Sequence, residues 1–348
     1  MFELPDPGWY LDNVLVHAQP GSDARIVVHE TDSWQRWWRT QLDRAAHEYP
    51  VPAALAAEQG TVVTSRQLAE AGVARHVVRR LVRDGLWSAP QPGIVSLIDP
   101  SDDDRWVLAR RRCAIRCAGA ALANPGHAVS RPGAAVLHGL PTRQVPGTAS
   151  LTAARRGNAR HGSRVAALEP ADVTEWFGTA VTTPARTCVD LARHDRRAGL
   201  MAADAALRQK LTTRAELESA LDWARGWYGV RQAREVIRFA DPRAESPLES
   251  VVRLALHDSG FPPPELQYEI FLPGRRWPLR VDFCWPEHRL VLEADGRTKY
   301  VGDANWREKQ REALIRPLGF RIERVIQADV EDTWATTSAY LWAALGRC

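Results

Sequence analysis

Between residues 51 and 97 the apolar positions first recur at helical spacing and then occur in two short extended runs. The pattern predicts helices over 51–59, 67–71 and 74–84, followed by strands at 86–87 and 94–97. Apolar side chains are expected on the inner face of the third helix, namely Val77, Val78, Leu81 and Val82. Three short helices followed by a two-stranded ribbon are typical of the winged-helix variant of the helix-turn-helix fold.

The pattern is weaker on both sides of this segment. Residues 1–50 are predicted to be a poorly specified leader, with a short amphipathic helix around Trp34, Trp37 and Trp38. Residues 100–240 mix helical stretches, such as 105–121 and 200–207, with short extended ones, which predicts a mixed α/β middle domain. The prolines and charges at 241–244 indicate a hinge. We therefore expect domains at 1–50, 51–99, 100–240 and 241–348.

The last domain shows a regular order of elements. A helix is predicted at 247–258, and strands are predicted at 268–272, 279–285 and 290–295. A helix at 306–316, a strand at 321–326 and a C-terminal helix follow. The order α-β-β-β-α-β is that of the restriction-endonuclease-like core. The predicted fold class is therefore α/β, with several domains.

The hairpin within this core determines which side chains face each other. A turn at Glu287-His288 pairs Trp285 with Leu290 and therefore places Asp282 opposite Glu293. Side chains alternate between the two faces of a strand. One face is expected to be wholly apolar and to form the core: Val281, Phe283, Trp285, Leu290, Leu292 and Ala294. The other face is expected to carry Arg280, Asp282, Cys284, Val291, Glu293 and Asp295.

Three carboxylates on one sheet face repel one another, because opposed side chains lie about 5 Å apart. A divalent cation with oxygen ligands, Mg²⁺ or Mn²⁺, would compensate them, with Asp282 and Glu293 as its ligands. Arginine pairing is the alternative, and the predicted register places Arg280 opposite Asp295. Lys299 follows a glycine turn and could fold back over such a site to orient water. It could equally be an ordinary surface lysine.

Glu249 has two interpretations that the sequence leaves open. Ser246 and Pro247 precede it as the N-cap and first residue of a helix, so Glu249 could complete a capping box. The same carboxylate could instead reach a metal through a water molecule.

Basic residues line the third helix of the 51–99 segment: Arg75, His76, Arg79, Arg80 and Arg83. Their spacing places them on one exposed face. In helix-turn-helix domains this helix enters the major groove of DNA, where arginine contacts guanine edges and phosphates. The alternatives are a solvated charged helix and a protein-binding winged helix.

Composition changes this interpretation little. The net charge of +4 and the pI of about 8.9 permit a polyanionic partner without requiring one. The five cysteines have neither disulfide nor zinc-site spacing, which indicates reduced thiols and a cytoplasmic protein. The N-terminus does not resemble a signal peptide, and no apolar run approaches the ~18 residues of a membrane helix.

Several stretches resemble known families. Residues 59–97, QGTVVTSRQLAEAGVARHVVRRLVRDGLWSAPQPGIVSL, resemble the N-terminal winged helix of AbiEi-type antitoxins of type IV toxin–antitoxin systems. AVSRPGAAVLHGL at 128–140 and TTPARTCVDLAR at 182–193 are similar to the domain that follows it. ESPLESVVRLAL, RVDFCWPEHRLVLEADGRTKY and WREKQREALIRPLGFRIERV resemble the domain-of-unknown-function family 559. That family is grouped with very-short-patch-repair endonucleases in the PD-(D/E)xK superfamily.

The second resemblance implies a nuclease site. Asp282 corresponds to the first aspartate of the motif and Glu293 to its second acid, while Asp295 stands where the motif has its lysine. Lys299 would replace that lysine, and Glu249 and Asp295 would assist. The main hypothesis is thus a DNA-binding protein with a Mg²⁺- or Mn²⁺-dependent endonuclease domain in defence, repair or mobile-element biology. The alternative is a non-catalytic antitoxin and autorepressor that binds double-stranded DNA and has a cognate toxin as its partner.

Overall fold

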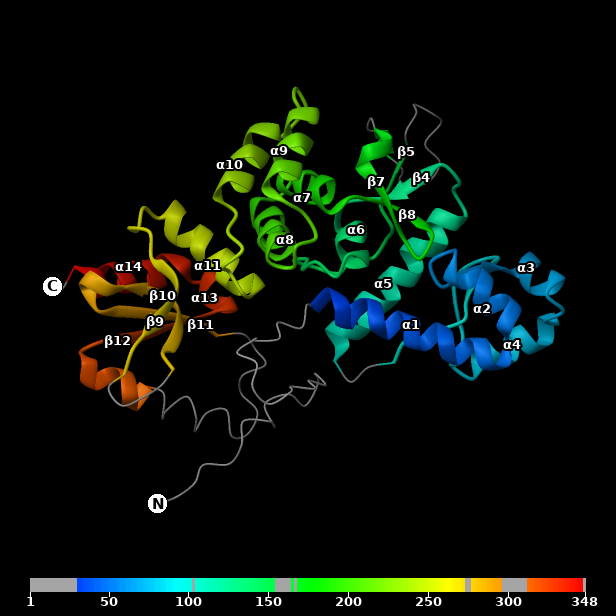
Figure 1. Cartoon of the computed structure of the whole chain (residues 1–348), viewed down its shortest axis with the longest axis horizontal. Helices are drawn as coiled ribbons and strands as arrows, with labels where there is room; N and C mark the ends of the chain where they lie inside the picture. The colour runs from blue at the N-terminus through cyan, green and yellow to red at the C-terminus, as the bar shows by residue number, and fades with distance from the viewer. Residues whose placement is uncertain are drawn as a thin grey trace, which may run out of the picture.

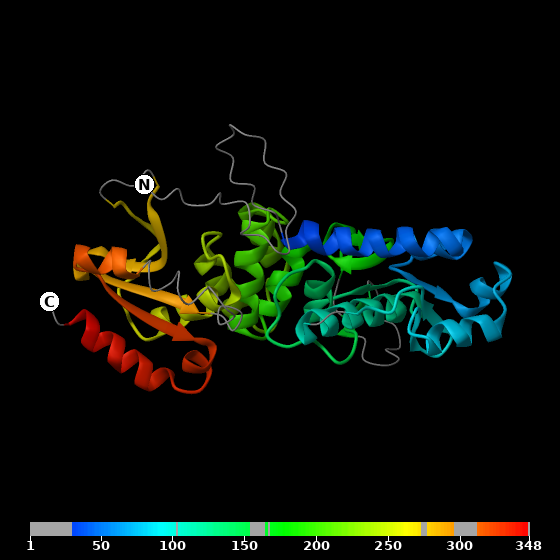
Figure 2. The same ribbon diagram turned by 90° about the horizontal axis from the view of Figure 1, so that it is seen from below.

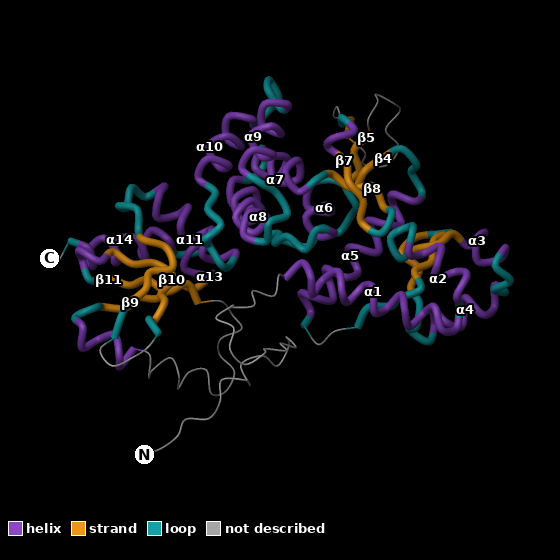
Figure 3. Tube along the Cα trace, in the orientation of Figure 1, coloured by secondary structure: helices purple, strands orange, loops and turns teal. Residues whose placement is uncertain are grey.

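The computed structural model of the 348-residue chain describes residues 30–101, 104–153, 164–165, 168–272, 277–295 and 312–346. The molecule is elongated, and its elements follow one another along the long axis (Figures 1 and 2). The described strands form three separate sheets, which Figure 3 shows as three groups. None of the described helices is long and apolar enough to span a membrane. The fold class is mixed α/β, as the sequence predicts.

The first sheet lies at the N-terminal end of the described chain. Its three strands have the order β1-β3-β2, with both pairings antiparallel. The elements of this region are α1 (Glu30–Glu48), α2 (Pro50–Ala57), β1 (Val62–Thr64), α3 (Ser65–Glu70), α4 (Arg75–Arg83), β2 (Ser88–Gln91) and β3 (Ile94–Ser96). All three predicted helices are therefore confirmed within two residues at each end. The prediction of a strand at 86–87 is wrong, because β2 begins only at Ser88.

Helix α1 is much better defined than the predicted leader. It has 19 residues, and Trp38 in its middle is fully buried. The Trp38 ring makes edge contacts with Trp34 and with Trp176, at centroid distances of 5.6 and 5.4 Å. The guanidinium of Arg111 lies 3.8 Å from the Trp37 ring. The tryptophan spacing that predicts an amphipathic helix is thus confirmed, and its apolar face fastens α1 to elements far along the chain.

The middle of the chain combines the second sheet with a group of helices. The five strands have the order β6-β5-β4-β8-β7, in which β4 runs parallel to β8. The elements are α5 (Arg105–Leu122), β4 (His127–Val129), α6 (Arg131–Leu137), β5 (Leu151–Ala153), β6 (Arg164–Val165), η2 (Pro170–Asp172), β7 (Val173–Trp176), β8 (Thr179–Thr182), α7 (Pro184–Ala192), α8 (Arg196–Arg208), α9 (Arg214–Trp223) and α10 (Val230–Phe239). The helices predicted at 105–121 and 200–207 are confirmed.

Two hydrophobic cores connect these parts. The first includes Trp38, Leu81 and Trp87 together with Cys117 and Val181, so it joins the first sheet to the second. The second core lies among α7, α8, α9 and α10 and extends to Leu254. The segment that contains α4 shares its hydrophobic core with the second sheet. This shared core fixes the orientation of the segment on the rest of the molecule.

The segment predicted as a hinge, 241–244, is held by buried polar groups. Arg253 pairs with Asp204 at 2.7 Å, and both side chains are almost wholly buried. The other carboxylate oxygen of Asp204 accepts the backbone N–H of Asp241 at 2.7 Å. Burial raises the pKa of Asp204, and Arg253 opposes that rise. These contacts tie α8 to the beginning of the C-terminal region.

The third sheet lies in the C-terminal region and has the order β12-β11-β10-β9, with β11 and β12 parallel. Its elements are α11 (Pro247–Asp258), β9 (Glu265–Ile270), β10 (Leu279–Trp285), η3 (Pro286–His288), β11 (Leu290–Asp295), η5 (Arg316–Leu318), β12 (Arg321–Ile326), α13 (Gln327–Glu331) and α14 (Trp334–Leu345). One sheet face packs against α11 and α14. Of the helix predicted at 306–316, residues 306–311 lie outside the described residues, and 312–315 are helical.

Trp38→Ala tests how strongly the first core depends on α1. We expect the substitution to lower the free energy of unfolding by about 3–5 kcal/mol, because it empties a fully buried aromatic site. Chemical denaturation of the whole chain measures the loss. Trp106→Ala is the control, because the Trp106 side chain is 45% exposed, and it should cost much less. Equal losses for the two variants would contradict the assigned role of Trp38.

Candidate functional site

Helix α4 presents the basic face that its sequence predicts. All five predicted residues are exposed: Arg75, His76, Arg79, Arg80 and Arg83. Arg83 contacts Asp84 at 3.3 Å in an exposed ion pair. Within the described ranges, Arg75, Arg79 and Arg80 have no acidic partner. Three uncompensated guanidinium groups therefore project from one short helix into solvent.

The opposite face of α4 anchors the helix. Leu81 is buried in the first core, and Val77, Val78 and Val82 pack against that core. Gly72 has a φ of 81° and ends the preceding helix, which lets the chain turn sharply into α4. The Val73 N–H then donates to the Leu68 carbonyl at 2.9 Å. The turn and the apolar stripe together direct the arginines outward.

The β10–β11 hairpin has the register that the turn predicts. Phe283 pairs with Leu292, Cys284 with Val291, and Trp285 with Leu290. The same register brings Asp282 to the level of Glu293. There the Asp282 Oδ2 accepts the backbone N–H of Ala294 at 2.9 Å. The Asp282 side chain is thereby fixed against the end of β11.

One predicted face assignment is wrong. Val281 packs with Cys284 and Val291 instead of with Phe283. On the neighbouring strand β9, Tyr268 pairs with Val281 and Leu266 with Phe283, and these two residues also pack on different sides of the sheet. Gln267 between them has a φ of 53°. This left-handed residue interrupts the alternation, so the two strands change faces at Gln267 and Asp282.

Glu249 lies at the third position of α11, but its carboxylate does not complete the predicted capping box, because it accepts the Glu245 N–H rather than the Ser246 N–H. Its N–H donates to the Ser246 hydroxyl at 3.1 Å, which confirms the predicted N-cap. Its carboxylate, on a side chain that is almost completely buried, accepts the Glu245 N–H and the Gln267 side-chain amide, each at 2.8 Å. Burial, and next the negative charge of Asp282, raise the pKa of Glu249. The structure therefore brings Glu249 and Asp282 together.

Glu293 and Asp295 are both buried. Arg280, the predicted counter-charge, forms an ion pair with Glu245 at 2.7 Å. The Arg324 guanidinium of the parallel strand β12 lies 3.4 Å from Asp295 and also contacts Glu312. The positive charge near Asp295 therefore comes from β12, a parallel neighbour of β11 that lies outside the hairpin.

Two functional neighbours were missed from the sequence. Gln267 and Arg324 sit in ordinary strand patterns, and nothing in their spacing indicates a link to the carboxylates. Lys299 lies outside the described residues. Among the described residues, no group of three or more histidine, cysteine, aspartate or glutamate side chains has the geometry to hold a metal ion.

Two sequence relatives, one domain family and one solved structure are similar to parts of this chain. Two relatives are the uncharacterized proteins MT2308 and Rv2248 of Mycobacterium tuberculosis, from strains CDC 1551 / Oshkosh and ATCC 25618 / H37Rv. Each is 40% identical over 209 residues, which cover 59% of this chain and 76% of the relative. The chain belongs to the family of these two mycobacterial proteins.

Residues 114–239 of the chain match the AbiEi antitoxin C-terminal domain. The match runs from α5 to the end of α10 and confirms the AbiEi-type resemblance of the stretches at 128–140 and 182–193. The crystal structure of the RV2827C protein from Mycobacterium tuberculosis is also similar, at 18% identity and a TM-score of 0.32 over 60% of this chain and 80% of that one. That likeness is too low to support an inference about the fold.

Glu249→Gln tests the raised pKa of Glu249, which burial and then the negative charge of Asp282 cause. Because this pKa is raised in the folded state, the stabilising contribution of Glu249 is complete below the unfolded-state pKa and is lost as the pH rises through the folded-state pKa. The wild type should therefore lose stability relative to Glu249→Gln over the pH range above about 4.3, the unperturbed pKa of glutamate. Denaturant unfolding across this range, with exposed Glu175→Gln as the baseline, measures the difference. A stability difference that does not change with pH, or that changes in the opposite direction, would contradict the raised pKa of Glu249.

Proposed function

We propose that the protein is a DNA-binding regulator of the antitoxin type, with α4 as the recognition helix of a winged-helix fold. The uncompensated arginine face of α4 is the observation that carries this proposal. The domain match to the AbiEi antitoxin C-terminal domain supports the antitoxin type. The function of the mycobacterial relatives is not established and adds no further support.

The arrangement around α4 supports a winged helix. Helices α2, α3 and α4 are followed by the β2–β3 ribbon, whose tip holds Gly93 with a φ of 80°. In such folds the recognition helix lies in the major groove and the ribbon extends beside it. Arg75, Arg79 and Arg80 would then contact base edges and phosphates of double-stranded DNA.

A cognate toxin would be the second partner. The match that suggests it covers residues 114–239, on elements distinct from α4. DNA binding and a toxin-directed activity would therefore use different surfaces of one molecule. Autorepression of a shared operon fits this division, because the regulator would bind its own promoter.

Arg79→Ala combined with Arg80→Ala tests the recognition helix. We expect the double variant to bind the protein's own promoter about tenfold more weakly or worse, because each base contact contributes ~1–3 kcal/mol. The slope of log K against log salt concentration should also fall by about 2, since two phosphate or base contacts are lost. A gel-shift titration at several salt concentrations measures both quantities.

The matched control is Arg225→Ala combined with Arg316→Ala, which removes two exposed arginines elsewhere. Its affinity and salt slope should equal those of the wild type. A wild type that binds no DNA, or two double variants that weaken equally, would contradict the role of α4.

A second candidate function is a divalent-metal-dependent endonuclease activity in the C-terminal region. The observation that favours it is the buried Glu249 carboxylate, which the Gln267 side chain of β9 holds and whose pKa is raised by burial and by the negative charge of Asp282. Glu293 and Asp295 are buried on the neighbouring strand. A Mg²⁺ or Mn²⁺ ion would relieve this repulsion, with Asp282 and Glu293 as its ligands and Glu249 and Asp295 beside them.

The chemistry of such a site follows from its donors. A bound divalent ion would lower the pKa of a coordinated water and withdraw charge from a DNA phosphate. The protein would hold the Asp282 carboxylate through the Ala294 N–H and the Glu249 carboxylate through Gln267. Lys299 would orient the attacking water in this proposal.

A plasmid-nicking assay with Mg²⁺ or Mn²⁺ tests the second candidate. Asp282→Asn and Glu293→Gln should each lower nicking by at least about a hundredfold, since each removes a ligand from a site on which catalysis depends. Glu287→Gln, exposed on the same hairpin, should cleave at the wild-type rate. No cleavage by the wild type with either metal, or equal cleavage by all four proteins, would exclude the nuclease.

A further inference from the structure

The outer face of α10 carries exposed charges of alternating sign. Arg231, Glu235 and Arg238 follow one another at three- and four-residue spacing, so they lie on one face of the helix. All three are exposed, and within the described part of the chain none has an ion-pair partner. The opposite face packs Ala233, Val236 and Ile237 into the second core. The charged face is therefore held rigidly toward solvent.

An exposed aromatic side chain stands at the N-terminal end of this face. Tyr228 is 84% exposed, the highest value among the large apolar residues that the structure describes. Its backbone is fixed, because Arg193 donates to the Tyr228 carbonyl at 2.8 Å. Gly229 has a φ of 77°, and a Cβ there would lie 2.1 Å from the Arg193 carbonyl oxygen. The chain thus presents a tyrosine to water from a backbone that cannot relax inward.

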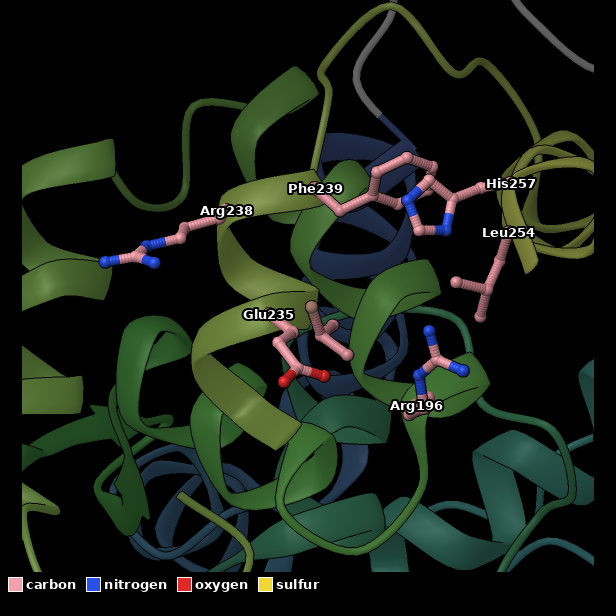
Figure 4. Close-up of a pocket in the computed structure, with 7 residues that line it drawn as sticks. Arg196, Glu235, Arg238, Phe239, Leu254 and His257 are labelled. Carbon is pink, nitrogen blue, oxygen red and sulfur yellow. The ribbon is translucent and has the colours of Figure 1, made fainter. Parts of the chain in front are cut away.

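A pocket of about 400 Å³ opens at the other end of α10. Phe239 and Leu254 form its apolar part, and Arg196, Glu235 and His257 surround them (Figure 4). The His257 ring lies against Phe239 with a centroid distance of 4.8 Å. Arg238 points away from this ring pair in Figure 4, so its guanidinium does not cover the apolar residues.

We propose that this face is the dimerisation surface for a second copy of the chain, with the two α10 helices antiparallel across a two-fold axis. Such an interface is self-complementary, so each contact occurs twice. Centring the axis at the level of Ala233 pairs Arg231 with Glu235 of the second copy. The same centre brings Tyr228 of each copy to Arg238 and the pocket end of the other, because 228 and 238 are equally distant from 233.

The geometry of a helix fits this arrangement. Within α10, Arg231 and Glu235 are four residues apart, which is about 6 Å along the helix axis, so both reciprocal Arg231–Glu235 pairs lie close to the two-fold axis. A tyrosine ring over the Arg238 guanidinium makes a cation–π contact. One symmetry operation therefore gives partners to the unpaired charges of the face and to an exposed tyrosine.

The alternating charges of this face favour a second copy over a nucleic acid or a uniformly acidic protein. Glu235 lies between two arginines, so a nucleic-acid backbone would meet repulsion at the centre of the face. A uniformly acidic protein would meet the same repulsion. An antiparallel copy presents arginine to each glutamate and glutamate to each Arg231. This inference does not depend on DNA binding by α4.

Reciprocal charge reversal tests the pairing directly. Sedimentation velocity on the full chain should show a wild-type dimer, and Arg231→Glu or Glu235→Arg should each raise the dimer Kd by about tenfold or more. Combining Arg231→Glu with Glu235→Arg should restore the wild-type Kd, because each new charge again meets its opposite. Tyr228→Ala should weaken the dimer while the circular-dichroism spectrum of the folded chain stays unchanged.

Two single reversals elsewhere serve as controls. Glu175→Arg on β7 and Arg105→Glu on α5 alter exposed charges of the same kind and should leave the dimer unchanged. A monomeric wild type at every concentration overturns the proposal. So does a dimer that survives both single reversals on α10, or one that the double reversal fails to restore while circular dichroism shows intact folding.

Discussion

Burial of Trp38 is the interaction on which the arrangement of the molecule depends. The Trp38 ring projects from α1 and contacts Trp176 of the second sheet, in a core that also holds Leu81 of α4. A core shared in this way cannot bend between its parts without opening a cavity, and closely packed interiors resist that. The arginine face of α4 is therefore oriented in part by Trp176, which lies about a hundred positions further along the sequence.

Buried ion pairs continue this rigidity toward the C-terminal region. Asp204 of α8 binds both Arg253 of α11 and the backbone of Asp241. Losing either side chain would leave a buried charge without its partner, which is costly in a medium of low polarity. The segment that the sequence marks as a hinge is thus a fixed connection. Surfaces on α4, on α10 and at the hairpin consequently belong to one continuous body.

How much the sequence could predict varied with the range of the interactions. The hairpin register followed from turn chemistry and side-chain alternation, which act over a few residues. The change of faces at Asp282 depends on the left-handed backbone of Gln267 in a different strand, and no local pattern signals it. The Arg324–Asp295 pair arises from a parallel strand pairing across the sheet. Apolar periodicity indicated α1, but only the packed core shows how firmly Trp38 holds it.

We propose that the outer face of α4 contacts DNA. Photo-crosslinking from a benzophenone amino acid at position 76, in the middle of that face, tests this claim most directly. We expect the probe at position 76 to crosslink to bases of the protein's own promoter, while the same probe at exposed Glu175 does not. A protein–DNA complex that forms without any crosslink from position 76, or that crosslinks equally from both positions, would contradict it.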